Sequence, residues 1–343
     1  MSRSIYQFQD LPQEERAAAP IARAPVQPVK ADRLVGILRN PRSYRNKARD
    51  AQIADRSNVV LAEPANRDAI PEVLADFARR GVHYLVIDGG DGTIRDVLTA
   101  GAPIFGASWP RLLVLPSGKT NALTVDLGMP RNWSLGDALD AIETGGRIER
   151  NPLAIRPADG RSGLVQGFIM GAGAFAKATE AGQTAHRWGA FNSVVVAVSA
   201  IWIALRTFFG TRASPYRRGS RMDVVLEPDG ERLPHAGRGD RSRRYFLLAS
   251  TLERFPINLK PFANLREGLR IAVMDEPRRR LLLSLPLLAF GWHGNWVRRH
   301  GVHRKWAEEF TIATETPFII DGEAFPPGKY VVAQGPRLRF VTP

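Results

Sequence analysis

Hydrophobic and polar positions follow two different patterns along this chain, and the change falls near residue 150. Before that point, short apolar runs are each followed by a polar loop and then by a helical pattern. The apolar runs lie at 34–38, 58–61, 84–87 and 112–115, and the helical patterns at 70–80, 94–98 and 134–144. Strands that alternate with helices in this way predict an open parallel sheet of the α/β class.

The second half of the chain has shorter alternating runs, separated by turns rich in Gly, Pro and Arg. These runs lie at 164–170, 222–227, 244–250, 269–274, 310–320 and 329–341. The pattern predicts an antiparallel domain, and we expect a β-sandwich. We therefore expect a flexible tail over 1–30, an α/β domain over 31–150 and a β-sandwich domain over 151–343 that holds the substrate.

Two apolar stretches interrupt the second half. Residues 189–205 contain no charge, and residues 281–290 contain Pro286. A helix that spans a membrane needs about 20 apolar residues, so both stretches are short for that role. One interpretation is a pair of buried helices inserted in the sandwich domain. The other is an apolar surface for an acyl chain or a bilayer, which the flanking arginines and the tryptophans Trp292 and Trp296 favour.

The balance of charges narrows the range of partners. The chain has 48 basic and 34 acidic side chains, a formal net charge of +14, which attracts nucleic acid, nucleotides or an anionic membrane. The basic clusters are not interleaved with aromatic residues in the manner of single-strand binders, so nucleic acid is disfavoured. The chain has no cysteine, which excludes disulfides, thiolate metal sites and cysteine nucleophiles. We expect a cytoplasmic protein, since the first 30 residues lack the apolar core of a signal peptide.

Residues 88–93, with the sequence Asp-Gly-Gly-Asp-Gly-Thr, carry the clearest chemical signal. They stand between an apolar strand pattern and a helical one. Glycines let the backbone approach a bulky anion, and the N–H groups that begin the next helix point at that anion. The segment therefore predicts a phosphate site. Asp91 lies within it, where a carboxylate is useful if Mg²⁺ accompanies the phosphates or a hydroxyl must be oriented.

Two further loops are expected beside this one. Residues 40–46 and 116–121 also follow predicted strands and contain Asn, Pro, Ser or Gly. In an open parallel sheet, ligands bind outside the carboxyl ends of the strands. The three loops are therefore expected to meet at one edge of the sheet.

A series of motifs resembles the diacylglycerol kinase catalytic family of lipid kinases, which includes sphingosine and ceramide kinases. In chain order the matching segments are Asn40-Pro41-Arg42-Ser43, Gly89-Gly90-Asp91-Gly92-Thr93, Leu115 to Leu123, Leu127-Gly128-Met129-Pro130 and Ile320-Asp321-Gly322-Glu323. NAD kinases and phosphofructokinases have similar glycine loops, so the ordered set is more specific than any one motif.

The resemblance implies a nucleotide-binding α/β domain, a β-sandwich domain and an active site between them. It also implies ATP with its Mg²⁺ as the phosphate donor and a lipid hydroxyl as the acceptor. The residues that would bind the nucleotide are Asn40, Gly89, Gly90, Gly92, Thr93, Gly118, Lys119, Thr120 and Asn121.

Three carboxylates are the candidate catalytic residues. Asp321 lies in an Asp-Gly-Glu turn, where it could take the proton of the attacking hydroxyl. Glu323 could help to order Mg²⁺ or the phosphates. Asp91 is the rival base, because resemblance to the sphingosine kinases would give it that role. Each position also has a purely structural interpretation, with Asp91 as a helix cap and Asp321 in a hairpin turn.

The chain departs from the pattern of many bacterial members of this family. Ala122 stands where an Asp is common, Asn151 stands where an Asp would open the sandwich domain, and Ala174-Phe175-Ala176 lacks an acidic residue. A structural Mg²⁺ network built on these carboxylates is therefore in doubt. The Asn121-Ala122-Leu123 segment is closer to sphingosine kinases.

We therefore expect an ATP-dependent lipid kinase that works at the surface of an anionic membrane. The acceptor is a sphingolipid, ceramide or a sphingoid base, slightly ahead of diacylglycerol. An NAD kinase is a weaker alternative, because a soluble acceptor requires neither apolar stretch. A membrane-binding module without activity is another, favoured by the missing carboxylates but opposed by the retained Asp91, Asp321 and Glu323.

Overall fold

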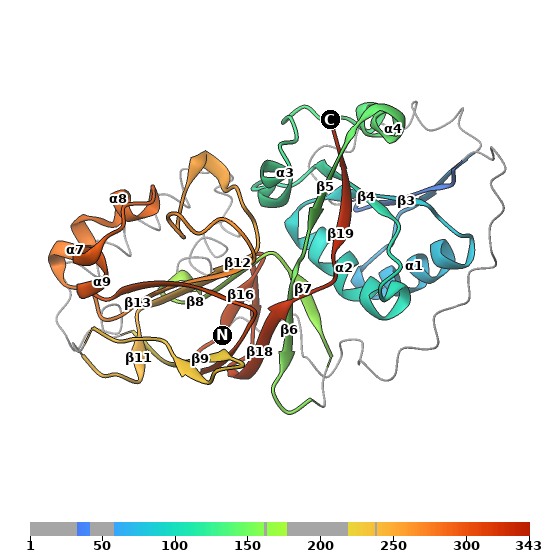
Figure 1. The fold of residues 1–343 in the computed structure, drawn as a ribbon. Helices are drawn as coiled ribbons and strands as arrows, with labels where there is room; N and C mark the ends of the chain where they lie inside the picture. Colours follow the sequence, from blue (N-terminus) through green and yellow to red (C-terminus); the bar gives the residue numbers. More distant parts are fainter. Residues whose placement is uncertain (1–32, 42–57, 161–162, 177–218, 237–238) are drawn as a thin grey trace.

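The computed structural model describes residues 33–41, 58–160, 163–176, 219–236 and 239–343. The expected tail over 1–30 and the apolar stretch 189–205 lie outside the described residues. Within them the chain forms two parts that lie side by side, one of parallel strands and helices and one of antiparallel strands (Figure 1).

The first part contains the expected parallel sheet. Its parallel strands are β1 (Val35–Arg39), β2 (Val59–Ala62), β3 (Tyr84–Gly89) and β4 (Arg111–Pro116), in the order β2-β1-β3-β4. Every residue of β1 and β3 is buried. Such strands have continuous apolar runs because helices cover both faces of a parallel sheet. The α/β prediction for this region is confirmed.

The helices of the first part begin close to the predicted positions. They are α1 (Ile70–Arg79), α2 (Asp91–Phe105), α3 (Ala122–Asp126) and α4 (Leu135–Thr144), with a 3-10 turn over Arg67–Ala69 before α1. Ser134 caps α4, and its side chain and that of Asp137 form a capping box. The sequence did not predict the short helix α3.

The chain terminus completes the first sheet. Strand β19 (Leu338–Thr342) pairs in parallel with β4 and antiparallel with β5 (Gly146–Arg150). The expectation that residues 329–341 lie wholly in the antiparallel domain is therefore wrong for β19 (Figure 1). Phe340 and Val341 are buried in the core of the first part. A pattern of buried positions predicts a strand, but it does not predict the sheet to which that strand belongs.

The second part consists of two antiparallel sheets. One has the order β10-β9-β15-β18-β6-β7, with β11 also beside β9, and the other has the order β14-β13-β12-β8-β16-β17. The first of these antiparallel sheets comprises β6 (Leu153–Pro157), β7 (Val165–Gly167), β9 (Ser220–Glu227), β10 (Glu231–Arg232), β11 (Arg243–Arg244), β15 (Glu309–Thr314) and β18 (Gly328–Gln334). The second comprises β8 (Ile169–Gly173), β12 (Phe246–Ser250), β13 (Leu269–Met274), β14 (Val302–Ala307), β16 (Phe318–Ile320) and β17 (Glu323–Phe325).

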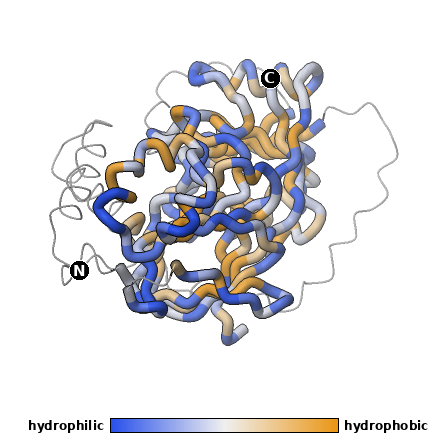
Figure 2. Tube along the Cα trace, turned by 60° about the vertical axis from the view of Figure 1, so that its left-hand side comes forward, coloured by the Kyte–Doolittle hydropathy of each residue, from blue (hydrophilic) through white to orange (hydrophobic). Residues whose placement is uncertain are grey.

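Both antiparallel sheets contribute to one apolar core. Val224 and Phe310 come from the first antiparallel sheet, and Leu247 and Ile271 come from the second antiparallel sheet. The sheets therefore pack face to face, as in a sandwich. Figure 2 shows that hydrophobic segments run through the interior of the molecule and that hydrophilic segments form many of its outer turns.

Three short helices stand between β13 and β14. They are α7 (Arg279–Leu283), α8 (Leu285–Ala289) and α9 (Asn295–Arg299). The apolar stretch 281–290 is thus divided at Ser284, and Pro286 lies in the first turn of α8. Among the described residues, no helix has both the length and the apolar character needed to cross a membrane.

The placement of β19 in the parallel sheet leads to a prediction about the stability of variants in this strand. Phe340 is fully buried, and its ring lies 6.5 Å from that of Phe168, between the ring centroids. Phe340→Ala should lower the free energy of unfolding by about 3–5 kcal/mol, because it leaves a cavity in the core. Urea unfolding followed by tryptophan fluorescence would measure this loss. The adjacent Arg339→Ala, which removes a solvent-exposed side chain, should cost no more than about 1 kcal/mol. Equal losses for the two variants would contradict the placement of β19.

Candidate active site

The loops that follow β1, β3 and β4 meet at the carboxyl edge of the parallel sheet. A Cβ atom on Gly90 would lie 2.9 Å from the Cα of Gly118, and a Cβ on Gly118 would lie 2.6 Å from the Cα of Gly90. Both positions therefore require glycine. The Asn40 amide donates a 2.9 Å hydrogen bond to the Thr93 hydroxyl. The expected convergence is thus present for the described part of the three loops, while Arg42 and Ser43 lie outside it.

The start of α2 has the geometry of a phosphate site. Gly90 is its N-cap, and the first bond along the helix runs from the Ile94 N–H to the Gly90 carbonyl. The N–H groups before Ile94 have no acceptor within the helix. A Cβ on Gly92 would meet nothing closer than 3.7 Å, so packing does not explain this glycine. Its bare backbone is open to a ligand.

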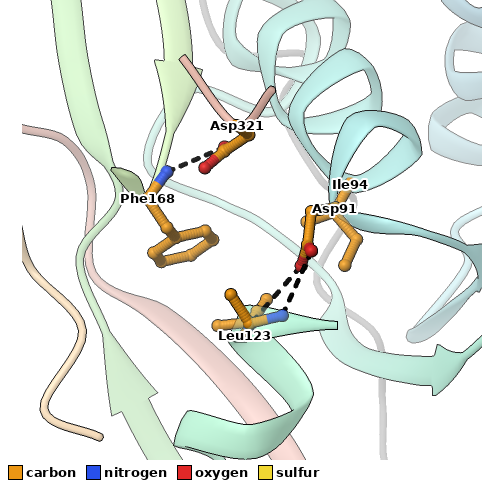
Figure 3. Close-up of a pocket in the computed structure, with 6 residues that line it drawn as sticks. Asp91, Ile94, Leu123, Phe168 and Asp321 are labelled. Atoms are coloured by element: carbon orange, nitrogen blue, oxygen red, sulfur yellow. Dashed lines mark hydrogen bonds between the residues drawn. The ribbon is translucent and has the colours of Figure 1, made fainter. Parts of the chain in front are cut away.

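Asp91 caps a helix other than its own. Its carboxylate accepts hydrogen bonds from the N–H groups of Ala122 at 3.1 Å and Leu123 at 3.4 Å, which begin α3 (Figure 3). Burial raises the pKa of the Asp91 carboxyl, although these backbone bonds oppose the rise. Asn121 has left-handed backbone, with φ of 52°, and its side chain bonds both the N–H and the carbonyl of Gly118 at 2.8 Å. Asp91 therefore caps a helix, and this cap places its carboxylate between α2 and α3.

Asp321 is held by a second pair of backbone N–H groups. Its carboxylate accepts 2.9 Å hydrogen bonds from the N–H of Phe168 (Figure 3) and from the N–H of Ile169. Asp321 and Gly322 form the two-residue turn between β16 and β17, both with positive φ. A Cβ on Gly167 would lie 2.6 Å from the Asp321 Oδ2, so glycine is needed there to leave room for the carboxylate.

The Asp91 and Asp321 carboxylates face one small pocket. Its lining residues are Asp91, Ile94, Ala122, Leu123, Phe168 and Asp321. Burial raises the pKa of Asp321 to about 7, and the charge of Asp91 contributes to the rise. The N–H of Phe168 and the charge of Arg95 act in the opposite direction. A carboxyl group that titrates near neutral pH in a pocket is suited to act as a general base.

Arg95 joins α2 to the Asp321 turn. Its buried guanidinium donates a 3.1 Å hydrogen bond to the carbonyl of Ile320 and bonds the Asp96 carboxylate at 2.8 Å. Glu323 lies near this pair: burial raises the pKa of its carboxyl, and the positive charge of Arg95 opposes the rise. Arg95 was not among the residues predicted from the sequence. An arginine one turn after the glycine loop, next to an aspartate, was the available signal.

Buried carboxylates outside the predicted set fix the elements that surround the pocket. Asp88 accepts hydrogen bonds from the Ser117 hydroxyl at 2.5 Å and from Arg39 at 3.2 Å, which ties together the ends of three neighbouring strands. Their apolar sequence context gave no sign of this network.

Asp126, at the end of α3, connects the two parts of the molecule. Its carboxylate accepts 2.7 Å hydrogen bonds from Arg150 and from the N–H groups of Glu253 and Arg254. It thereby holds the loop after β12 against the α/β part.

Other predicted residues lie away from the two carboxylates. Lys119 and Thr120 are exposed at the tip of their loop, whereas Gly118 and Asn121 on either side of them are half-buried. Asn151 donates a 2.8 Å hydrogen bond to the carbonyl of Gly335, where the chain crosses between the two parts. His303 on β14 also lies away from the pocket. It is buried and lies 3.0 Å from Asp275, because β14 turns it inward.

The described residues fit a magnesium ion that arrives with a nucleotide. They contain no group of three or more Asp, Glu or His side chains able to hold a metal ion. Mg²⁺ bound to nucleotide phosphates usually takes only one or two protein carboxylates. Asp91 and Glu323 meet that requirement, and Ala122 and Asn151 supply no carboxylate for a separate all-protein site.

Comparison with known proteins agrees with this geometry. The family model of the diacylglycerol kinase catalytic domain matches residues 37–152. These residues belong to the diacylglycerol kinase catalytic-domain family. This stretch of the chain therefore has the sequence of a lipid kinase catalytic domain. No curated protein matches this chain.

Over most of its length the chain resembles solved structures in fold. A crystal structure of a diacylglycerol kinase from Bacillus anthracis str. Sterne has 13% sequence identity, covers 92% of this chain and 98% of its own, and gives a TM-score of 0.58. A second structure from the same bacterium has 14% identity, covers 92% and 99%, and gives a TM-score of 0.62. At these identities the likeness establishes the fold alone.

The proximity of Asp91 and Asp321 leads to a prediction about the pKa of Asp321. Asp91→Asn removes a negative charge that raises the pKa of Asp321, so it should lower that pKa from about 7. Burial of Asp321 remains and should keep its pKa above the ordinary value for an aspartate. Carboxyl carbon chemical shifts of the ligand-free protein, followed by NMR against pH, would show this change. Asp137→Asn, at the start of α4, serves as a control. An unchanged Asp321 titration in Asp91→Asn would contradict the coupling.

Proposed function

We propose that this protein is an ATP-dependent lipid kinase, which transfers the γ-phosphoryl group of ATP to a hydroxyl of a membrane lipid. The observation that supports this most strongly is the pair Asp91 and Asp321, which face one desolvated pocket beside the glycine loop. The family of residues 37–152 agrees with phosphate transfer to a lipid.

In this proposal the glycine loop binds the ATP phosphates. The first N–H groups of α2 and the Thr93 hydroxyl donate to the phosphate oxygens, and Asn40 orients that hydroxyl through its 2.9 Å hydrogen bond. Gly118 and Asn121 form the opposite wall, and Thr120 and the exposed Lys119 reach the phosphates from its tip. Mg²⁺ bound to ATP would neutralise phosphate charge beside Asp91 and Glu323.

Asp321 acts on the acceptor. The lipid hydroxyl enters the pocket, and its oxygen attacks the γ-phosphorus. The bond between this phosphorus and the bridging oxygen of ADP breaks, and ADP keeps the electron pair. The hydroxyl proton passes to the Asp321 carboxylate, which the N–H groups of Phe168 and Ile169 hold in place. Transfer of this kind depends mainly on positioning and charge neutralisation, so the proton can move late.

A sphingolipid, either ceramide or a sphingoid base, is the acceptor we favour slightly. The support is the Asn121-Ala122-Leu123 segment, whose sequence resembles the sphingosine kinases. Diacylglycerol, which would yield phosphatidic acid, is the alternative, and the name of the matched family favours it. In either case we propose a cytoplasmic protein bound peripherally to an anionic membrane.

The proposed function predicts phosphate transfer in a defined assay. Labelled γ-phosphate from Mg-ATP should appear on one lipid of a micelle-presented panel of ceramide, sphingosine, diacylglycerol and monoacylglycerol. The labelled lipid identifies the acceptor. NAD serves as the soluble control, and label on NAD would replace the lipid kinase with an NAD kinase. Absence of label on every acceptor, with ATP still bound, would favour a binding module without activity.

Asp321→Asn should lower turnover by at least about two orders of magnitude, the size of a general-base contribution. ATP affinity should change little, because Asp321 lies on the acceptor side of the pocket. Turnover and ATP binding, measured on the same preparation, test this separation. Glu323→Gln is the matched control, since it neutralises the other carboxylate of the turn and should act through Mg-ATP affinity. Near-normal turnover in Asp321→Asn would remove Asp321 from the mechanism and assign the base to Asp91.

A further inference from the structure

A patch of exposed apolar side chains lies on the insertion between β13 and β14. Its members are Leu283 (70% exposed), Leu287 (59%), Phe290 (57%), Trp292 (40%) and Trp296 (39%), which we call the insertion patch. In the described part of the chain, the other large apolar side chains with high exposure come from three separate segments, at Leu61, Ile257 and Trp306. Contiguous apolar surface of this kind marks an interaction site.

The inner side of the same short helices already packs on the sandwich. Leu281, Leu288 and Val297 are buried against Met274 and Val302 of the neighbouring strands. The helices are five residues long and have apolar side chains on both their inner and outer sides. The insertion patch is therefore in addition to the side chains that attach the insertion to the fold.

The fold holds the insertion patch in a fixed shape. Arg304 on β14 donates hydrogen bonds to the carbonyls of Pro261 at 2.7 Å, Trp292 at 3.0 Å and Leu288 at 3.1 Å. The rings of Trp292 and Trp296 stack with centroids 5.1 Å apart. A surface that is held from below and carries stacked aromatic rings is organised before it meets a partner.

The insertion itself carries basic residues and no acidic ones. Residues 277–307 contain no Asp or Glu. The exposed arginines 278–280 lie at the start of α7, and the exposed arginines 298 and 299 end α9, so positive charge flanks the apolar surface on both sides. A second copy docked on the same face would bring these arginines together without a carboxylate from the insertion to neutralise them. An anionic lipid surface offers acyl chains to the patch and phosphates to the arginines.

We propose that the insertion patch docks the protein on an anionic bilayer, with α7 to α9 lying in the interfacial layer. Tryptophan and arginine are the residues expected at that depth. Figure 1 shows α7 to α9 at the outer end of the sandwich, away from the α/β part. The patch therefore holds the enzyme on the membrane that contains its acceptor and does not form the reaction pocket. The role given to this docking rests on the proposed function, but the binding of the protein to vesicles can be measured without kinase turnover.

The test uses the full chain and vesicles without ATP. Sedimentation with vesicles of phosphatidylcholine and about 30% phosphatidylglycerol should recover the parent protein, and pure phosphatidylcholine vesicles should bind it at least about tenfold less. The double variant Leu287→Gln/Phe290→Gln should lower the partition coefficient on the anionic vesicles at least about tenfold, since two apolar side chains no longer enter the interface. Leu61→Gln, an exposed apolar position on β2, is the matched control and should bind as the parent does.

Two further readouts distinguish the docking proposal from the proposed function. The double variant should phosphorylate a dispersed short-chain acceptor at the parental rate, while its rate on vesicle-borne acceptor falls with its binding. Patch-dependent binding without kinase activity would retain the docking surface and remove the proposed function. If the double variant bound the anionic vesicles as strongly as the parent protein does, the docking proposal would be overturned. A parent dimer that the double variant dissociates in sedimentation velocity would also overturn it, because the occupant would then be a second copy.

Discussion

The candidate active site depends on two carboxylates that are each held by a pair of main-chain N–H groups. Asp91 accepts from the first residues of α3, and Asp321 accepts from Phe168 and Ile169. These bonds keep the two side chains in one pocket although burial and their like charges raise the pKa of Asp321. Because the N–H groups belong to backbone segments, the pocket geometry is determined by how α2, α3 and the β7–β8 corner pack.

That packing is built from contacts between the two parts of the molecule. Arg95 on α2 bonds the carbonyl before Asp321, and Asp126 on α3 bonds the loop after β12. The ring of Phe168 lies in the core of the α/β part, next to Phe340 of the terminal strand. The chain therefore returns from the sandwich to the first sheet, and this crossing fixes the two halves of the pocket relative to each other.

The sequence predicted those features that depend on local pattern. Buried runs predicted the parallel strands and the meeting of the loops after them at one edge of the sheet. The structure adds that Gly90 and Gly118 lie so close there that only a residue without Cβ fits. The partners of Asp91 and Asp321 could not be predicted, because they come from residues 122–123 and 168–169, far along the chain. The membership of β19 in the first sheet was missed for the same reason. Local periodicity predicts that a segment forms a strand, but it does not predict the strand with which that segment pairs.

We propose that Asp91 and Asp321 depend on each other in phosphoryl transfer, and a double-mutant cycle tests this dependence most directly. Turnover of labelled γ-phosphate would be measured for the parent, Asp91→Asn, Asp321→Asn and the double variant at a fixed pH. Coupled residues show strong non-additivity, so the double variant should lose little more than the worse single variant. Losses that multiply, with the effect of the double variant equal to the product of the two single effects, would contradict the account.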